Sequence, residues 1–299
     1  MLRKFRGTGV ALVTPFKENG QIDFDGLKKV IDHAIKGKVE YLVTLGTTGE
    51  SVTLSKEEKS KVLDFTIDAV KGRVPLVAGF GGNNTAEIID SIRHYHFTGI
   101  DAILSVSPYY NKPAQEGIYR HFRAIADASP VPVILYNVPL RTASNMLAQT
   151  TLRLARDSKN IIGIKEASGD FQQVMTILRD KPEDFFLVSG EDAITFPLVF
   201  LGCDGVISVV ANAFPKDFSE MVRAALNYDV IRSRTLHYKL LDIMSLIFRE
   251  GNPAGVKCAL ELLGVCNAGV RLPLVPASEN LRNDLQAALH ALSKTKAMA

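Results

Sequence analysis

Short apolar runs alternate with longer amphipathic segments along most of the chain. Apolar runs bounded by turn residues are typical of strands covered on both faces. Between them, segments such as 23–37 and 55–72 carry apolar residues at helical spacing, with Asp or Ser at the N-cap and Gly at the C-terminal cap. Eight runs are predicted as strands: GVALVTPF from Gly9, YLVTLG from Tyr41, VPLVAGFG from Val74, DAILSVSP from Asp101, VPVILYNVP from Val131, IIGIKEA from Ile161, FFLVSGED from Phe185 and GVISVV from Gly205.

Repeated strand–helix units predict a parallel sheet, and eight of them predict closure into a (β/α)8 TIM barrel. From about Val230 onward the strand pattern stops, and residues 231–250, 255–264 and 279–299 all have helical patterns. We therefore expect a barrel over residues 1–229 and a C-terminal helical appendage over residues 230–299. No long linker separates the two, so the appendage is expected to pack on the barrel.

Composition and charge narrow the class of partner. The chain has 299 residues, 46% of them hydrophobic, and a formal net charge of only +3, which favours a globular protein without a nucleic-acid or membrane partner. The start MLRKFRGTGVALVTPF resembles no secretory signal, and no apolar stretch approaches the ~20 residues of a membrane span. Its three cysteines, Cys203, Cys258 and Cys266, form no C-x-x-C pair, so a cytoplasmic location is expected.

Lys165 ends an otherwise apolar run, NIIGIKEASGD. In a TIM barrel the carboxyl ends of the strands line the active site, and a neutral lysine amine there attacks carbonyl carbons. Walls made by Ile162 and Ile164 would favour that neutral form. The alternative is that Lys165 pairs with Glu166 and only holds a loop, but alternation along a strand predicts that these two side chains point to opposite sides.

Other strand ends also carry polar chemistry. The turn GTTGES, before a helix expected near Ser55, could hold an anion on its N–H groups and threonine hydroxyls; the alternative is a plain tight turn. SPYYNKP and YNVPLRT add tyrosines and Arg141, which alone could be rim packing and an exposed-loop arginine. Their expected convergence on one face of the barrel favours a site.

Three further patterns carry no functional prediction. AGFGGNNTAE has Asn84 where a dinucleotide-binding G-x-G-x-x-G needs its third glycine. His94 and His96 are two residues apart, which does not place them on one helix face as metal ligands, so no metal site is expected. The stripe of Leu240, Leu241, Ile243, Met244 and Ile247 indicates core or subunit packing.

GTTGES, PYYNKP, YNVPLRT, IIGIKEASG, GVISV and NPAGVK occur in this order, and together they resemble the dihydrodipicolinate synthases (4-hydroxy-tetrahydrodipicolinate synthases). These belong to the pyruvate-dependent class I aldolases that include N-acetylneuraminate lyase. The resemblance implies condensation of pyruvate with L-aspartate 4-semialdehyde, a step toward diaminopimelate and lysine. It implies no cofactor beyond the covalent Schiff base between Lys165 and pyruvate, and a homotetramer built from dimers.

The resemblance also assigns roles residue by residue. Lys165 would be the Schiff-base lysine, Tyr136 would move protons during imine formation, and Thr47 would link Tyr136 to Tyr110, which serves the site of a partner subunit. Thr47 and Thr48 would receive the pyruvate carboxylate, and Arg141 the carboxylate of the second substrate. Gly190 and Ile207 would line the pocket.

In lysine-inhibited members the effector binds at positions that match Ser51, Val52, Leu54, Lys56, Lys59, Asn83, Glu87 and Tyr109. Lys56 stands where inhibited enzymes commonly have histidine, and a second cation should weaken the binding of cationic lysine. Two other functions stay open: another pyruvate-dependent aldolase or lyase such as N-acetylneuraminate lyase, against which Arg141 and the TT pair of GTTGES (ST in typical lyases) argue, and a keto-acid-binding barrel without turnover.

Overall fold

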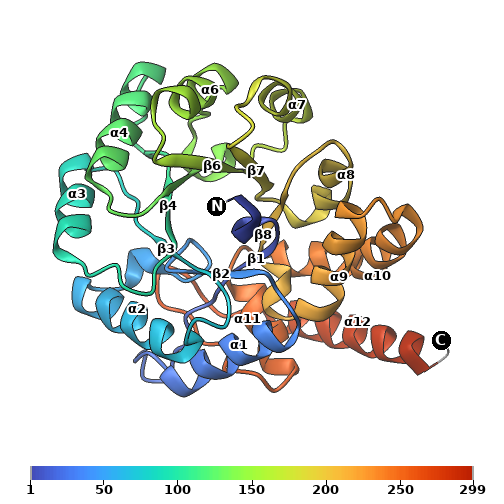
Figure 1. Ribbon diagram of the computed structural model, residues 1–299. Helices are drawn as coiled ribbons and strands as arrows, with labels where there is room; N and C mark the ends of the chain where they lie inside the picture. Colours follow the sequence, from blue (N-terminus) through green and yellow to red (C-terminus); the bar gives the residue numbers. More distant parts are fainter. Residues whose placement is uncertain (1, 298–299) are drawn as a thin grey trace.

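Eight parallel strands close into a barrel in the computed structural model, which describes residues 2–297, with the side chains of residues 4–292 (Figure 1). Each strand pairs with the next, and β8 pairs back with β1 so that Ile207 lies opposite Gly9. The strands are β1 (Gly7–Ala11), β2 (Tyr41–Thr44), β3 (Leu76–Gly79), β4 (Ala102–Val106), β5 (Val133–Asn137), β6 (Ile161–Glu166), β7 (Phe186–Ser189) and β8 (Gly205–Ser208). The predicted (β/α)8 barrel is confirmed, and each of the eight apolar runs contains one strand.

Helices surround the barrel and follow its strands in sequence. The α-helices are α1 (Phe24–Lys36), α2 (Lys56–Val70), α3 (Thr85–His94), α4 (Gln115–Ala128), α5 (Pro139–Thr142), α6 (Ala148–Asp157), α7 (Phe171–Asp180), α8 (Thr195–Phe200), α9 (Pro215–Leu226), α10 (Val230–Phe248), α11 (Ala254–Leu262) and α12 (Glu279–Ala297). The 3₁₀ helices are η1 (Leu2–Phe5), η2 (Ser51–Thr53), η3 (Asp192–Ile194) and η4 (Val210–Asn212).

The predicted caps begin α1 and α2, and one predicted C-terminal cap is wrong. The Asp23 side chain accepts the N–H of Gly26 at the start of α1, and Gly37 ends that helix. Ser55 and Glu58 form a capping box at the start of α2. The C-cap of α2 is Lys71, with a left-handed backbone at φ 50°, and not Gly72. Lys71 and Gly72 both have a positive φ, and α2 ends one residue earlier than the sequence predicts.

The barrel interior is filled by side chains, as expected for eight strands. At the amino-terminal end Phe5 of η1 contacts Tyr41 edge-on at 5.4 Å between ring centroids and lies 5.8 Å from Phe186. Two further apolar clusters lie between the sheet and the surrounding helices. Aromatic side chains therefore fill the interior at the amino-terminal ends of the strands.

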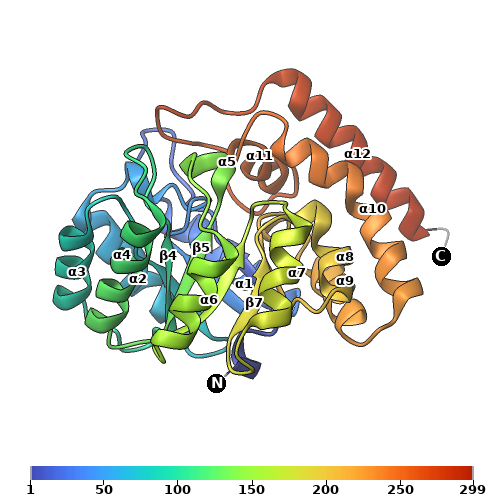
Figure 2. The same cartoon turned by 90° about the horizontal axis from the view of Figure 1, so that it is seen from above.

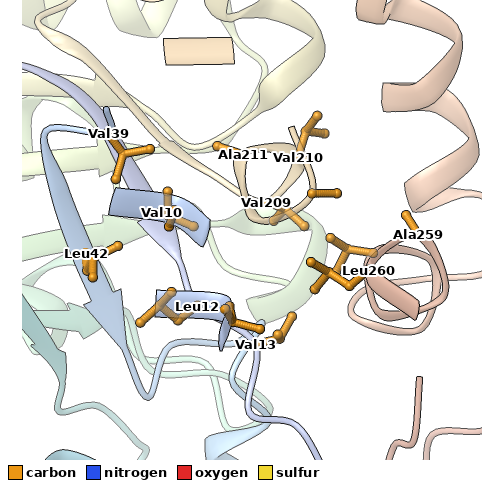
Figure 3. Packing of buried hydrophobic residues seen from close by; sticks show 14 of the residues in the cluster. Val10, Leu12, Val13, Val39, Leu42, Val209, Val210, Ala211, Ala259 and Leu260 are labelled. Atoms are coloured by element: carbon orange, nitrogen blue, oxygen red, sulfur yellow. The ribbon is translucent and has the colours of Figure 1, made fainter. Parts of the chain in front are cut away.

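The C-terminal helices pack on the barrel, as predicted. The predicted boundary at 229/230 falls between α9 and α10, and Leu240, Ile243, Met244 and Ile247 are buried, with Leu241 packed beside them. In Figure 3, Ala259 and Leu260 of α11 lie beside Val13 and Val209 of the barrel. Figure 2 shows α11 and α5 at the end of the barrel opposite the N-terminus. None of the helices among the described residues has the length and hydropathy needed to cross a bilayer.

Candidate active site

Lys165 and Tyr136 lie side by side at the carboxyl ends of β6 and β5. The two residues are direct partners in the strand register, and Lys165 Nζ lies 4.4 Å from the centroid of the Tyr136 ring. Lys165 is 5% exposed and Tyr136 is 6% exposed. Tyr136 belongs to the interior cluster of the barrel, so the amine and the phenol share one buried space inside it.

Glu166 points away from Lys165, so the alternative of a simple Lys165–Glu166 ion pair is wrong. Its carboxylate accepts hydrogen bonds from Asn137 Nδ2 (3.0 and 3.2 Å), from the Ser168 N–H (2.7 Å) and from Gln173 Nε2 of α7 (3.0 Å). Burial raises the pKa of this carboxyl, and these donors oppose the rise. Asn137 directly follows Tyr136 on β5, and Glu166 directly follows Lys165 on β6. The hydrogen bonds from Asn137 to Glu166 therefore join the ends of these two strands next to the site.

A local irregularity in β6 corrects the expected wall of the site. The register between β5 and β6 shifts so that Val133 pairs with Ile161 while Ile134 pairs with Gly163. The unpaired Ile162 turns into the barrel interior, whereas Ile164 packs in the cluster between sheet and helices. Ile162 can therefore wall the Lys165 site, but Ile164 faces away from it, contrary to the prediction.

Gly190 lies against the Lys165 side chain at the end of β7. A Cβ at this position would come within 3.0 Å of Lys165 Cε and 2.6 Å of the Ala167 Cβ. The Gly190 N–H donates to the carbonyl oxygen of Glu166 at 2.7 Å, which fixes this close approach. Ile207, 1% exposed, belongs to the same interior cluster as Tyr136. Gly190 therefore lies against the Lys165 side chain and Ile207 lies in the barrel interior, while their lining of a substrate pocket stays a prediction.

Two acids near Lys165 escaped the sequence analysis. Asp192 is buried and accepts the N–H groups of Val209 and Val210, each at 3.0 Å, which connects the ends of β7 and β8. Burial raises its pKa and that of Glu191, and the Lys165 charge opposes the rise in both. The Arg141 charge acts on Glu191 in the same direction. Acids directly after a strand end, as in SGED, are the signal that could have identified them.

The GTTGES turn offers unpaired N–H groups. Gly49 and Glu50 donate their N–H groups within the turn, to Gly46 O and Thr47 O at 3.1 Å each. Within the described part of the chain, no hydrogen bond occupies the N–H of Thr47 or Thr48. The Thr48 hydroxyl accepts from Asn252 Nδ2 at 2.9 Å. Two free N–H groups side by side with two hydroxyls suit a carboxylate, which supports the predicted anion site over a plain turn.

A cavity of about 940 Å³ opens beside these strand ends. Its lining includes Thr47, Tyr136 and Arg141, and also all eight positions matched to the lysine effector site: Ser51, Val52, Leu54, Lys56, Lys59, Asn83, Glu87 and Tyr109. Lys165 does not line this cavity itself, but its amine contacts the ring of Tyr136, which does. Arg141 is exposed on the one-turn helix α5 rather than on a loop. One continuous space therefore joins Thr47, Tyr136 and Arg141 to the candidate effector positions.

Tyr110 stands apart from the other site residues. Its side chain is 90% exposed and it does not line the cavity. Its φ of 65° is left-handed, an uncommon conformation for a bulky residue and one that tends to occur at functional positions. Within this single chain Tyr110 does not complete the predicted relay with Thr47 and Tyr136.

The patterns set aside in the sequence have ordinary places in the fold. Asn84 caps α3 by accepting the N–H groups of Ala86 and Glu87. His94 and His96 are exposed, as predicted. In the described part of the chain, no group of three or more His, Cys, Asp or Glu side chains is arranged to hold a metal ion.

Comparison with known proteins places the chain among its relatives. Residues 4–292 match the family model of the dihydrodipicolinate synthetase family. The chain belongs to this family. A relative from Flavobacterium psychrophilum named 4-hydroxy-tetrahydrodipicolinate synthase is 53% identical over 293 residues, which cover 98% of this chain and 100% of the relative. The resemblance inferred from six motifs is confirmed.

Two solved structures of family members are closely similar to this chain. The Acinetobacter baumannii enzyme, described as chloride-inhibited and complexed with pyruvate, matches at 40% identity and a TM-score of 0.93, over 96% of this chain and 99% of that one. The Cyanidioschyzon merolae enzyme, with lysine bound, matches at 37% identity and a TM-score of 0.93, over 97% and 99% of the respective chains.

Proposed function

We propose that this chain condenses pyruvate with L-aspartate 4-semialdehyde, as a 4-hydroxy-tetrahydrodipicolinate synthase of the lyase class. The observation that carries the proposal is the buried Lys165–Tyr136 pair inside the barrel mouth, Nζ 4.4 Å from the ring centroid. The full-length identity of 53% to a relative with that name supports it.

In the proposed mechanism, the neutral Lys165 amine attacks the keto carbon of pyruvate, and water leaves to give an iminium ion. Tyr136 delivers the proton that the departing hydroxyl needs. Loss of a methyl proton then gives the enamine, whose carbon forms a bond to the aldehyde carbon of the second substrate. The amino group of that substrate finally displaces Lys165, so the ring closes and the free amine is regenerated without any cofactor.

Substrate binding divides between two anion sites. The free N–H groups of Thr47 and Thr48 are assigned to the pyruvate carboxylate. Arg141, exposed on the cavity wall, is assigned to the carboxylate of the semialdehyde, since guanidinium groups bind carboxylates through two parallel hydrogen bonds. This second site favours a short carboxylated aldehyde over the sugar aldehyde of a sialic-acid lyase.

A coupled assay tests the proposal. Pyruvate and L-aspartate 4-semialdehyde are supplied together with a reductase that consumes the cyclic product, and N-acetylneuraminate cleavage is measured in parallel. Rapid synthase turnover with negligible cleavage is expected. Cleavage without synthase turnover would assign the lyase reaction instead, and trapping of pyruvate by borohydride without turnover of either kind would favour a keto-acid-binding barrel.

We also propose a cytoplasmic homotetramer built from dimers, in which Tyr110 reaches a partner's site. Besides Tyr110, the apolar Val52 and Leu140 are 79% and 88% exposed, and exposed apolar groups are typical of subunit interfaces. The three cysteines are free thiols, which suits a reducing compartment. Light scattering at assay concentrations checks the assembly, and a fully active monomer would contradict it.

Free lysine is expected to inhibit this enzyme weakly or not at all. Lys56 Nζ already lies 3.9 Å from the Glu87 carboxylate, on the wall of the proposed effector site. A lysine ligand would have to share that carboxylate with Lys56 and accept a second positive charge nearby. Inhibition titrations of the wild type and of Lys56→His test this: the variant should bind lysine more tightly. A sub-millimolar inhibition constant for the wild type would contradict the prediction.

Gly190→Ala is expected to lower kcat by about 10- to 100-fold, because displacement of a reacting group by about 1 Å costs that much. The new methyl group would displace Lys165 Cε, which lies 3.0 Å from the Cβ position. Gly82→Ala is the matched control for adding a methyl group, because Gly82 does not have a left-handed backbone and a Cβ there would meet only Ile88, at an ordinary contact distance of 3.8 Å. Unchanged kcat in Gly190→Ala, with the fold intact by circular dichroism, would show that Lys165 does not need its observed position.

A further inference from the structure

Glu50 is a buried acid that the proposed mechanism does not use. It lies two residues after Thr48, which with Thr47 is assigned to the pyruvate carboxylate. Its side chain is 1% exposed, and its backbone is left-handed at φ 52°. Burying a carboxylate is costly unless it is paired, and a left-handed glutamate adds strain. A buried, left-handed glutamate needs partners that stabilise its charge and its backbone. The partners of Glu50 therefore show which contacts stabilise the turn.

Those partners come from the C-terminal helical segment. Lys257 of α11, 0% exposed, forms an ion pair with Glu50 Oε1, and its Nζ also donates to Gly269 O at 2.7 Å. The other carboxylate oxygen, Oε2, accepts the Arg271 N–H at 3.0 Å. Both oxygens of Glu50 are thus held by residues more than 200 positions away in sequence.

Arg271 extends the same contact to the elements that follow the turn. Its guanidinium donates to Glu58 at 2.6 and 2.8 Å and to Thr53 O at 2.9 Å. These hydrogen bonds lower the pKa of Glu58 to about 2. Glu58 is the capping-box residue of α2 and Thr53 ends η2, so the chain is fixed on the far side of the turn as well.

A third contact acts on the substrate-binding residue itself. Asn252 donates to Thr48 Oγ1 at 2.9 Å, which leaves the hydroxyl proton of Thr48 free to be donated elsewhere. Thr14 Oγ1 holds the next residue by donating to Gly49 O at 2.7 Å. Three consecutive residues of the turn, 48–50, are therefore each held by a side chain from outside it.

The segment that supplies Lys257 is itself fixed to the barrel. Val256, Cys258, Ala259 and Leu260 of α11 are buried, and Figure 3 shows Ala259 and Leu260 beside the loop that follows β8. The ion pair therefore joins the turn to a support that is packed against the barrel, not to a free helix.

We propose that Lys257 and Asn252 are positioning residues for the pyruvate-binding turn, through Glu50 and Thr48 respectively, so that the C-terminal helical segment sets pyruvate affinity. The inference rests on the proposed function, in that the turn is taken to hold the pyruvate carboxylate. An apolar pair of similar volume would stabilise the fold equally well. The Lys257–Glu50 ion pair, together with the Arg271 N–H that donates to the second Glu50 oxygen, instead fixes one orientation of the N–H groups of Thr47 and Thr48.

Three variants of the full chain test this role. Lys257→Met should raise the KM for pyruvate about tenfold, the scale of one misplaced hydrogen bond, and should leave the KM for the semialdehyde within about twofold. The double variant Glu50→Gln, Lys257→Met removes the unpaired buried charge, so Tm should recover toward the wild type while the KM for pyruvate stays raised. Asn252→Ala removes the hydrogen bond to Thr48 and should raise the same KM, with Tm measured in parallel to show that the variant is folded.

Arg282→Met is the matched control. It removes an ion pair with Glu261 in the same segment, and Arg282 contacts no residue of the turn. It should leave both KM values unchanged. The inference is overturned if the folded double variant and Asn252→Ala bind pyruvate as the wild type does, or if Arg282→Met raises the pyruvate KM equally.

A second readout separates this inference from the proposed function. The pyruvate concentration that half-saturates borohydride inactivation is measured without the second substrate, so it reports pyruvate binding alone. An increase of about tenfold in the variants over the wild type is expected. A wild type that is not inactivated would overturn the Schiff-base function and this inference with it, whereas equal half-saturation in wild type and variants would overturn this inference alone.

Discussion

Lys165→Ala is expected to lower kcat/KM for the synthase reaction by about 10,000-fold or more, as removal of a covalent nucleophile commonly does. The amine is buried at the barrel mouth, in register with Tyr136 and against Gly190, and no other lysine among residues 4–292 lies in this arrangement. The buried Lys257 is engaged with Glu50 and Gly269, so it cannot replace Lys165 as nucleophile. The measurement is the coupled assay, with protein purified away from any host enzyme.

Lys159→Ala serves as the control for this variant, because Lys159 is exposed and lies two residues before the start of β6. It should retain wild-type kcat/KM and Tm. Lys165→Ala should also keep its fold, which its Tm and circular dichroism check. Residual activity within tenfold of the wild type would rule out Lys165 as the nucleophile.

Tyr136→Phe is expected to lower kcat by 100- to 10,000-fold, the usual range for loss of a positioned general acid–base group. The substitution keeps the ring over which Lys165 lies and removes only the hydroxyl, so the effect isolates proton transfer from packing. Imine formation itself should slow, which single-turnover trapping with pyruvate and borohydride measures.

Tyr119→Phe is the matched control for loss of a phenol hydroxyl. The Tyr119 hydroxyl, on α4, donates to Asp157 at the end of α6, so the pair lies in the helical layer outside the barrel strands. This control should retain full activity. A Tyr136→Phe enzyme with kcat within threefold of the wild type would mean that water or another residue supplies the proton.

Much of this architecture is encoded in local sequence patterns. Eight apolar runs predict eight strands because strands covered by helices need apolar residues on both faces. Closure of the barrel then brings Lys165, Tyr136 and the GTTGES turn to one end, although each lies at a different place in the chain. The residues at the strand ends could be identified as candidate site residues from sequence alone, because the fold places all of these ends at one face of the barrel.

Other features depend on contacts that no local pattern contains. The side that Ile164 faces depends on a register shift between β5 and β6, which the composition of β6 does not determine. The link between Glu50 and Lys257 joins residues 207 positions apart, and each alone resembles an ordinary surface charge in the sequence. Lys71 ends α2 ahead of Gly72 because both residues accept a left-handed backbone in this turn.

The account as a whole depends on Lys165 carrying pyruvate, and one measurement tests that most directly. Wild-type protein is reduced with borohydride in the presence of pyruvate and digested, and the modified peptide is sequenced by mass spectrometry. The account predicts a single carboxyethyl adduct on Lys165, in the peptide that contains IIGIKEASG, and its loss in Lys165→Ala. An adduct on any other lysine, or no adduct at saturating pyruvate, would contradict it.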